Sequence, residues 1–141
     1  MEKEREKIIR ELKNFFKKKK DVSFAYLFGS VARNISHSKS DIDVAVFLSG
    51  RGDRFDRRID LIAELEKKFK KDTDVVVLND ARSVFLKHVI ASEGVLVFEG
   101  DKEKRIDFEI RTAREYSDYL PYFKMYKDNI LSGKKYDKVY H

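Results

Sequence analysis

The chain has 141 residues, of which 31 are Lys or Arg and 25 are Asp or Glu, so its formal net charge is +6. The length corresponds to about one domain with one core. The absence of cysteine excludes disulfides and thiolate metal sites, and no apolar run is long enough to cross a membrane. We therefore expect a soluble, cytoplasmic protein with no membrane partner, and the basic balance favours a polyanionic one.

The N-terminal part of the chain predicts a helix followed by two strands. Apolar residues recur at helical spacing between residues 8 and 16, which indicates an amphipathic helix. Residues 22–29, VSFAYLFG, are rich in β-branched and aromatic side chains and end at glycine, as buried strands often do. A short helix is expected to start at Ser30, and residues 41–48, DIDVAVFL, predict a second strand.

The second half of the chain continues the same alternation. Residues 53–71 keep a helical period and predict a long helix, and residues 74–78, DVVVL, predict a third strand. Residues 81–92 indicate another helix, and residues 95–100, VLVFEG, indicate a fourth strand. These elements favour pairing into one sheet with helices around it.

The last element is a long helix that begins near Asp101, in which Pro121 predicts a kink or a division. The resulting order, α-β-α-β-α-β-α-β-α, predicts a small α/β domain with a sheet covered by helices. We expect one domain over residues 1–141, with its core at about residues 22–98 and the terminal helices packed on it.

Two carboxylates stand at the start of the second predicted strand. Asp41 and Asp43 are one residue apart, and alternate residues of a strand point to the same face. Two carboxylates on one face can share a pair of divalent ions, and Mg²⁺ commonly binds one or two carboxylates together with substrate phosphates. The pattern therefore indicates a site for a nucleotide triphosphate, although acidic residues at the mouth of a strand can also be merely solvated.

A possible phosphate site follows the first predicted strand. Gly29 would let the backbone approach a phosphate closely, and Ser30 is expected at a helix N-cap, where backbone amides face an anion. Arg33 could add a cationic fork, or it could be an ordinary surface arginine.

Asp74 is the candidate for a third carboxylate. It opens the third predicted strand as Asp41 opens the second, so it would lie beside the acidic pair if those strands are neighbours. There it would bind metal or orient the attacking hydroxyl. Asp72 lies two residues away on the same face and is an alternative.

These motifs resemble a known family. Gly29 and Ser30, ten residues, and then Asp41-x-Asp43 resemble the signature of the DNA polymerase β-like nucleotidyltransferase superfamily. The string GSVARNISHSKSDIDVAV, followed by DTDVVVLND, is similar to the minimal nucleotidyltransferases, the MntA-type antitoxins. Asn34 stands where many relatives have glycine.

The resemblance implies the nucleotidyltransferase fold, which is a small mixed β-sheet flanked by helices, and it implies a reaction. Two Mg²⁺ ions bound by Asp41, Asp43 and Asp74 would align a hydroxyl against the α-phosphate of ATP, with Gly29, Ser30 and Asp41 among the residues that contact the nucleotide, together with Asp43 and Arg33. In that family the acceptor is typically a tyrosine of a cognate HEPN-domain ribonuclease toxin, encoded by the neighbouring gene. A hetero-oligomer with this toxin is therefore expected, and nucleic-acid binding is compatible with the charge but not favoured.

Two other functions stay open from the sequence alone. The enzyme could transfer a nucleotide to a small molecule or to an RNA end, although little chain is left for a second substrate domain. Alternatively, the protein could neutralise its partner by binding alone. Residues Arg82 to His88 also match the R-x(4–6)-H pattern of the all-helical HEPN ribonucleases, which is more often accidental on a helix between two strands.

Overall fold

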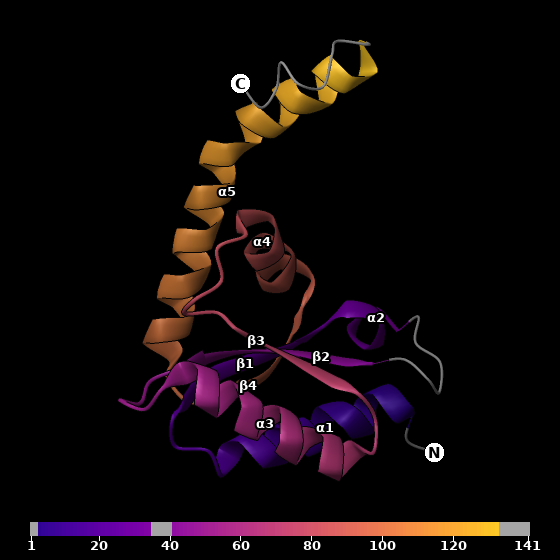
Figure 1. Cartoon of the computed structure of the whole chain (residues 1–141), viewed down its shortest axis with the longest axis vertical. Coiled ribbons are helices and arrows are strands. Elements are labelled where there is room, and N and C mark those ends of the chain that lie inside the picture. The colour runs from indigo at the N-terminus through magenta and orange to yellow at the C-terminus, as the bar shows by residue number, and fades with distance from the viewer. Residues whose placement is uncertain (1–2, 35–40, 133–141) are drawn as a thin grey trace.

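The computed structural model describes residues 3–34 and 41–132, and it contains a four-stranded sheet with helices on both faces (Figure 1). Residues 1–2, 35–40 and 133–141 lie outside the described residues. The elements, in chain order, are α1 (Glu4–Lys17), β1 (Val22–Phe28), α2 (Gly29–Ala32), β2 (Ile42–Leu48), α3 (Arg54–Phe69), β3 (Thr73–Val77), α4 (Val84–Glu93), β4 (Val95–Glu99) and α5 (Lys102–Leu131). This is the predicted order of helices and strands.

The sheet is mixed, as expected, with the strand order β3-β2-β1-β4. β1 runs antiparallel to both β2 and β4, whereas β2 and β3 are parallel. The parallel pair results from the crossover through α3, which returns the chain to the same end of the sheet. The second and third predicted strands are therefore neighbours, which is the condition that the third carboxylate required.

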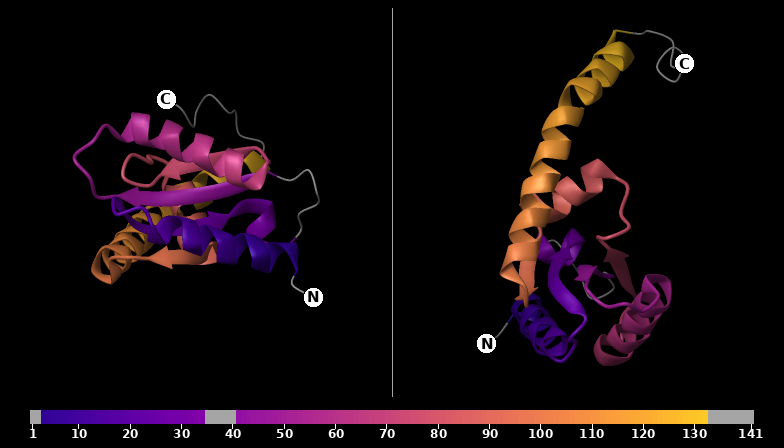
Figure 2. Two further views of the ribbon diagram at one scale, coloured as in Figure 1. Left: turned by 90° about the horizontal axis from the view of Figure 1, so that it is seen from below. Right: turned by 90° about the vertical axis from the view of Figure 1, so that its left-hand side faces the viewer.

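One face of the sheet carries the larger core. The inward residues of β2 alternate along the strand, so Ile42, Val44 and Val46 all point to this face and are fully buried. Helix α1 supplies Leu12 and Phe16 to the same core, and α3 packs beside it. Figure 2 shows α1 and α3 lying along this face.

The opposite face of the sheet is covered by α4 and by the first half of α5. Its core centres on the aromatic residues Phe24 and Phe108, whose ring centroids are 5.6 Å apart. The Tyr26 hydroxyl donates a hydrogen bond to Glu109, which anchors α5 to β1 at this face. Asp43 and Asp74 occupy positions that also point to this face, because they alternate with the buried residues of the first core.

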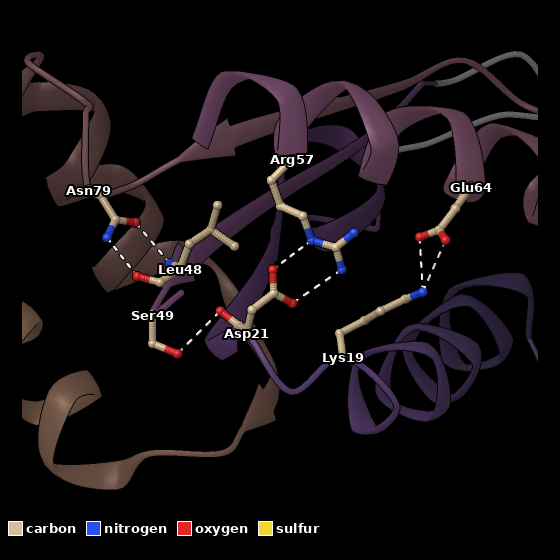
Figure 3. A network of polar contacts seen from close by, with 7 residues as sticks. All are labelled: Lys19, Asp21, Leu48, Ser49, Arg57, Glu64 and Asn79. Atoms are coloured by element: carbon tan, nitrogen blue, oxygen red, sulfur yellow. Dashed lines mark hydrogen bonds and ion pairs between the residues drawn. The ribbon is translucent and has the colours of Figure 1, made fainter. Parts of the chain in front are cut away.

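A polar network fastens α3 to the turn that precedes β1 (Figure 3). Arg57 donates two hydrogen bonds to the carboxylate of Asp21, at 2.6 and 3.1 Å. Lys19 forms an ion pair with Glu64 at 3.0 Å. A two-point bond between carboxylate and guanidinium restricts geometry more than a single contact does, so α3 is held in a defined orientation on the sheet.

One predicted boundary needs a correction, and of the kink or division predicted at Pro121 the division is absent. Helix α4 begins at Val84 and not at residue 81, because Ser83 acts as its N-cap and accepts a hydrogen bond from the backbone N–H of Leu86. Pro121 does not divide α5, which continues through it to Leu131 as one helix of 30 residues. Figure 1 shows this helix changing direction toward its C-terminal end, in keeping with the backbone hydrogen bond that a proline removes.

Within residues 3–34 and 41–132, none of the helices combines the length and the apolar character that crossing a bilayer would require.

Candidate functional site

The three predicted carboxylates lie together at one end of the sheet. Asp43 of β2 and Asp74 of β3 are partners in the parallel register, so they sit side by side on neighbouring strands and on the same face. Asp41 directly precedes β2 and is exposed. Asp72, the alternative, precedes β3, and its carbonyl oxygen accepts a hydrogen bond from the backbone N–H of Ile42. The strand register thus favours Asp74 over Asp72 as the neighbour of Asp43.

Gly29 lies directly against the carboxylate of Asp43. A Cβ atom added at Gly29 would fall 2.3 Å from Oδ2 of Asp43, which is far closer than two such atoms can approach. The backbone of Gly29 also has φ of 79°, in the left-handed region where other residues are strained. Both observations explain why the position after β1 requires glycine, and they bring the predicted phosphate loop into contact with the predicted metal ligands.

The electrostatics of Asp43 reflect this crowding. Burial raises the pKa of Asp43 above its ordinary value of 3.8, and the negative charges of Asp74 and Asp41 raise it further. A carboxylate whose ionised form is destabilised by its neighbours is one that a cation would stabilise. The site therefore concentrates negative charge that its own residues do not fully neutralise.

The short helix α2 differs from the expectation in one respect. Its N-cap is Phe28, so Ser30 lies within the first turn and is not the N-cap residue that the sequence predicted. Arg33 is exposed at the end of α2. Among the described residues, no hydrogen bond or ion pair joins either side chain to the three carboxylates, so the structure places them beside the site without assigning them a contact in it.

The backbone conformation of Asn34 explains why asparagine can stand at the position in the turn where many relatives have glycine. Its backbone has φ of 59°, and its N–H donates to the carbonyl oxygen of Val31 as α2 ends. Asparagine is one of the few residues other than glycine that adopt this left-handed conformation readily. The substitution therefore preserves the backbone of the turn.

Arg58 is a component of the site that the sequence did not indicate. It projects from α3 and donates from Nη2 to Oδ1 of Asp74 at 3.0 Å and from Nε to the carbonyl oxygen of Val75 at 2.6 Å. Two bonds to adjacent groups of β3 orient both the arginine and the carboxylate. No spacing rule could have found this pair, because 16 residues separate its members and only the packing of α3 on β3 joins them.

The donor set suits a hard cation. All three candidate ligands are carboxylates, and two of them come from adjacent strands of a rigid sheet, as Mg²⁺ sites in phosphoryl-transfer enzymes require. Across the described ranges, no three Asp, Glu or His side chains already converge as ligands of one ion. A cation that used Asp74 would share that carboxylate with Arg58.

Three cavities that are lined by described residues do not include these carboxylates. One of about 520 Å³ lies at the other end of β2, between Phe47 and the first half of α5. Three of the cations that line it already form ion pairs, and these pairs are Arg54 with Asp80, Lys87 with Glu115 and Arg111 with Asp107. Asp41 and Asp74 are exposed at their end of the sheet, and Asp43 is partly buried.

The residues that match the HEPN pattern, Arg82 to His88, do not lie in an all-helical domain as they do in HEPN ribonucleases. Arg82 precedes α4, and the imidazole of His88 stacks on the ring of Tyr116 with centroids 3.5 Å apart. This pattern belongs to a helix that covers a sheet, and His88 serves the packing of α4 on α5.

Comparison with known proteins agrees with the geometry. The family model described as polymerase beta, nucleotidyltransferase matches residues 10–103. No curated protein matches the sequence significantly. Among solved structures, a toxin–antitoxin complex with AMP-PNP has a chain that is 25% identical, with a TM-score of 0.70 over 92% of this chain and 99% of that one.

Two further solved structures share the fold. A chain of an MntA–HepT toxin–antitoxin complex is 24% identical, with a TM-score of 0.63 over 90% of this chain and 96% of that one. A tri-AMPylated HEPN toxin of Shewanella oneidensis in complex with its MNT antitoxin contains a chain that is also 24% identical, with a TM-score of 0.63 over 90% of this chain and 95% of that one. The family match spans well over half of the chain and includes Gly29, Asp43 and Asp74. The chain therefore belongs to the polymerase beta nucleotidyltransferase family.

Proposed function

We propose that this protein is a Mg²⁺-dependent adenylyltransferase that transfers AMP from ATP to a hydroxyl of a partner HEPN toxin. The acceptor that we propose is a tyrosine hydroxyl, and the transfer makes the protein the antitoxin of this toxin. The observation that carries the proposal is the in-register pairing of Asp43 with Asp74, with Gly29 pressed against Asp43. The similar solved structures support the partner and the nucleotide, because they are toxin–antitoxin complexes, one with AMP-PNP and one with an AMPylated HEPN toxin.

The candidate site residues would have different roles in the reaction. Asp41, Asp43 and Asp74 would hold Mg²⁺, which when bound neutralises charge on the phosphates and on the attacking oxygen. Gly29 would allow the backbone after β1 to lie close to both Asp43 and the triphosphate, with Ser30 in α2 and Arg33 at the C-cap of α2. The acceptor oxygen forms a bond to the α-phosphorus while the bond to pyrophosphate breaks, so the products are an AMP-protein and pyrophosphate. Arg58 would keep the carboxylate of Asp74 oriented toward the acceptor side.

The proposal is tested by incubating the protein with Mg²⁺, the toxin encoded by the neighbouring gene and ATP labelled either at the α- or at the γ-phosphate. The α-label is expected on the toxin and the γ-label is not, because nucleotidyl transfer retains only the α-phosphate. The double variant Asp41→Asn with Asp43→Asn is expected to abolish labelling, whereas the exposed Asp60→Asn on α3 serves as a matched control.

Three outcomes would contradict this function. Wild-type protein that transfers no α-label to the toxin would refute adenylylation, and transfer of the γ-label would indicate a kinase. Full protection of cells from the toxin by the Asp41→Asn, Asp43→Asn variant would favour neutralisation by binding alone. Mapping of the modified peptide by mass spectrometry then tests whether the acceptor is a tyrosine.

A further inference from the structure

The second half of α5 extends beyond the rest of the molecule. Residues 116–131, called the arm below, project from the sheet on the side where α4 lies, and Figures 1 and 2 show this from two directions. The first half of the same helix is anchored by the buried residues Phe108 and Thr112. The arm therefore has a fixed base and an outer part that the described remainder of the chain does not cover.

One side of the arm carries a regular row of side chains. They are Tyr116, Leu120, Phe123, Lys127 and Ile130, called the seam below. Their spacing alternates between four and three residues, which is the spacing that lets one helix pack lengthwise against another. The seam borders a groove of about 730 Å³ that also includes Phe85 of α4 and the residues Lys124, Tyr126 and Leu131.

The apolar members of this groove are exposed to an unusual degree. Leu120 is 43% exposed, Ile130 is 47% exposed and Phe85 is 56% exposed. Isolated exposed apolar residues are common on proteins, but a contiguous apolar groove along a projecting helix indicates a surface that another molecule covers.

We infer that the arm is the docking surface for one amphipathic α-helix of the partner toxin, which lies along the seam and places acidic residues opposite Lys124 and Lys127. The inference rests on the proposed function for the identity of the partner. The alternating spacing of the seam selects a helix over a strand or a small ligand.

The charges of the arm argue for a different chain over a second copy of this one. Lys124 and Lys127 line the groove, and the whole chain carries a net charge of +6, so two copies would bring like charges together. The similar toxin–antitoxin structure with AMP-PNP matches 92% of this chain, so a chain of nearly this extent occurs in a complex with a different protein.

The position of the arm relative to the carboxylates is also consistent with a protein substrate. Asp43 and Asp74 point to the face of the sheet that α4 and the first half of α5 cover. A toxin docked on the arm would lie on that same side of the sheet. Docking on the arm would thus place the acceptor hydroxyl on the side of the sheet to which Asp43 and Asp74 point.

The test compares two double variants of α5 that are matched in chemistry. Leu120→Ser with Ile130→Ser changes the seam, and Ile106→Ser with Ile110→Ser makes the same change outside it, at residues that are 38% and 47% exposed. Each variant is mixed with the purified toxin, and the dissociation constant is measured by calorimetry. Light scattering gives the mass of each protein alone and of the complex, and circular dichroism checks the fold.

The seam variant is expected to bind the toxin at least about 10-fold more weakly, while the control variant binds as wild type does, because a few apolar anchors dominate most interfaces. Lys124→Glu with Lys127→Glu is expected to weaken binding too, and most strongly at low salt.

Equal binding by the seam variant and wild type, or no binding of the toxin by wild type, would overturn the inference. The inference would also be overturned if the protein alone formed a dimer and the seam variant were a monomer, since the groove would then bind a second copy of the chain. Failure of adenylylation is distinguishable, because seam-dependent binding without transfer of the α-label would refute the proposed reaction and leave the docking surface standing.

Discussion

At the scale of single residues, Gly29 couples the backbone after β1 to the carboxylate of Asp43. An alanine there would need both a left-handed backbone and a Cβ atom inside the space of Oδ2. The left-handed conformation alone costs about 1–2 kcal/mol for a residue with a side chain. The steric conflict can be relieved only by displacing Asp43 or the backbone around Gly29. A Cβ atom at Gly29 would therefore affect both the stability and the activity.

We therefore expect Gly29→Ala to lower the free energy of unfolding by about 1–2 kcal/mol or more and to reduce adenylylation sharply, because Asp43 must move. Urea unfolding and transfer of α-labelled phosphate measure the two effects. Gly52→Ala is the matched control, since nothing lies within 4 Å of a Cβ atom at Gly52. Wild-type activity in Gly29→Ala would show that the close approach of Gly29 and Asp43 is not needed.

The ionised carboxylate of Asp43 lowers the stability of the folded state. Burial and two neighbouring carboxylates raise its pKa above 3.8, so its ionisation is less favourable in the folded state than in the unfolded one. The contribution of Asp43 to the free energy of unfolding therefore decreases as the pH rises from about 4 through the raised pKa, and it stays low at neutral pH.

Asp43→Asn is accordingly expected to unfold at a higher temperature than wild type at pH 7 in the absence of metal, and this advantage should shrink as the pH falls toward 4. Thermal unfolding with a chelator present, followed by circular dichroism at several pH values, measures the difference. Asp118→Asn, an exposed change on α5, should alter the melting temperature little. A lower melting temperature for Asp43→Asn at pH 7 would be inconsistent with the repulsion described for this site.

At the scale of elements, α3 matters to the site because it carries Arg58 to Asp74. The helix is held on one side by the pair of Arg57 with Asp21 and on the other by the bonds of Arg58 to β3. The two arginines are adjacent in sequence and make comparable contacts, but only Arg58 reaches the carboxylate site. We therefore expect Arg57 to stabilise the fold and Arg58 to position Asp74, although both arginines lie on α3.

Arg58→Gln is expected to slow adenylylation by about 10-fold, mainly through kcat, because groups that orient a metal-binding carboxylate typically have effects of this size. Arg57→Gln should lower the melting temperature without slowing the reaction at temperatures where it is folded. Steady-state kinetics and thermal unfolding of both variants make the comparison. Equal loss of kcat in the two variants would indicate that α3 acts only through stability.

At the scale of the whole molecule, the mixed sheet holds Asp41, Asp43 and Asp74 near one another at one end, where a bound cation would offset their charge. A ligand that binds only the folded state raises stability in proportion to the logarithm of its concentration over Kd. At ten times Kd, the gain is about 1.4 kcal/mol, which corresponds to roughly 4 °C in melting temperature for a domain of this size.

Mg²⁺ with a non-hydrolysable ATP analogue is therefore expected to raise the melting temperature of wild type by several degrees, about 4 °C at ten times Kd, and removal of the metal with a chelator should reverse the shift. The variant Asp41→Asn with Asp43→Asn should show no such shift. Differential scanning calorimetry provides the measurement. An equal shift in wild type and in the double variant would place the metal and nucleotide elsewhere on the molecule.

Much of this protein follows from its sequence alone. The order of helices and strands and the glycine and aspartate motif depend on local patterns, because side-chain periodicity and turn chemistry act over a few residues. The mixed direction of the strands was implied only by the family resemblance. The choice of Asp74 over Asp72, however, required the parallel register of β2 and β3. The cap residues of α2 and α4 and the continuity of α5 through Pro121 likewise appeared only in the structure.

What only the tertiary structure decided are the contacts between residues far apart in the chain. The bond of Arg58 to Asp74 depends on how α3 packs on β3, and no spacing in the sequence indicates it. Gly29 and Asp43 belong to one spaced motif, but their close approach depends on the pairing of β1 with β2. The exposure of the arm was also decided by the tertiary structure. Periodicity shows that a helix has an apolar side, but it does not show whether the rest of the chain buries that side. Local patterns determined the elements and the chemistry, and packing determined which groups meet.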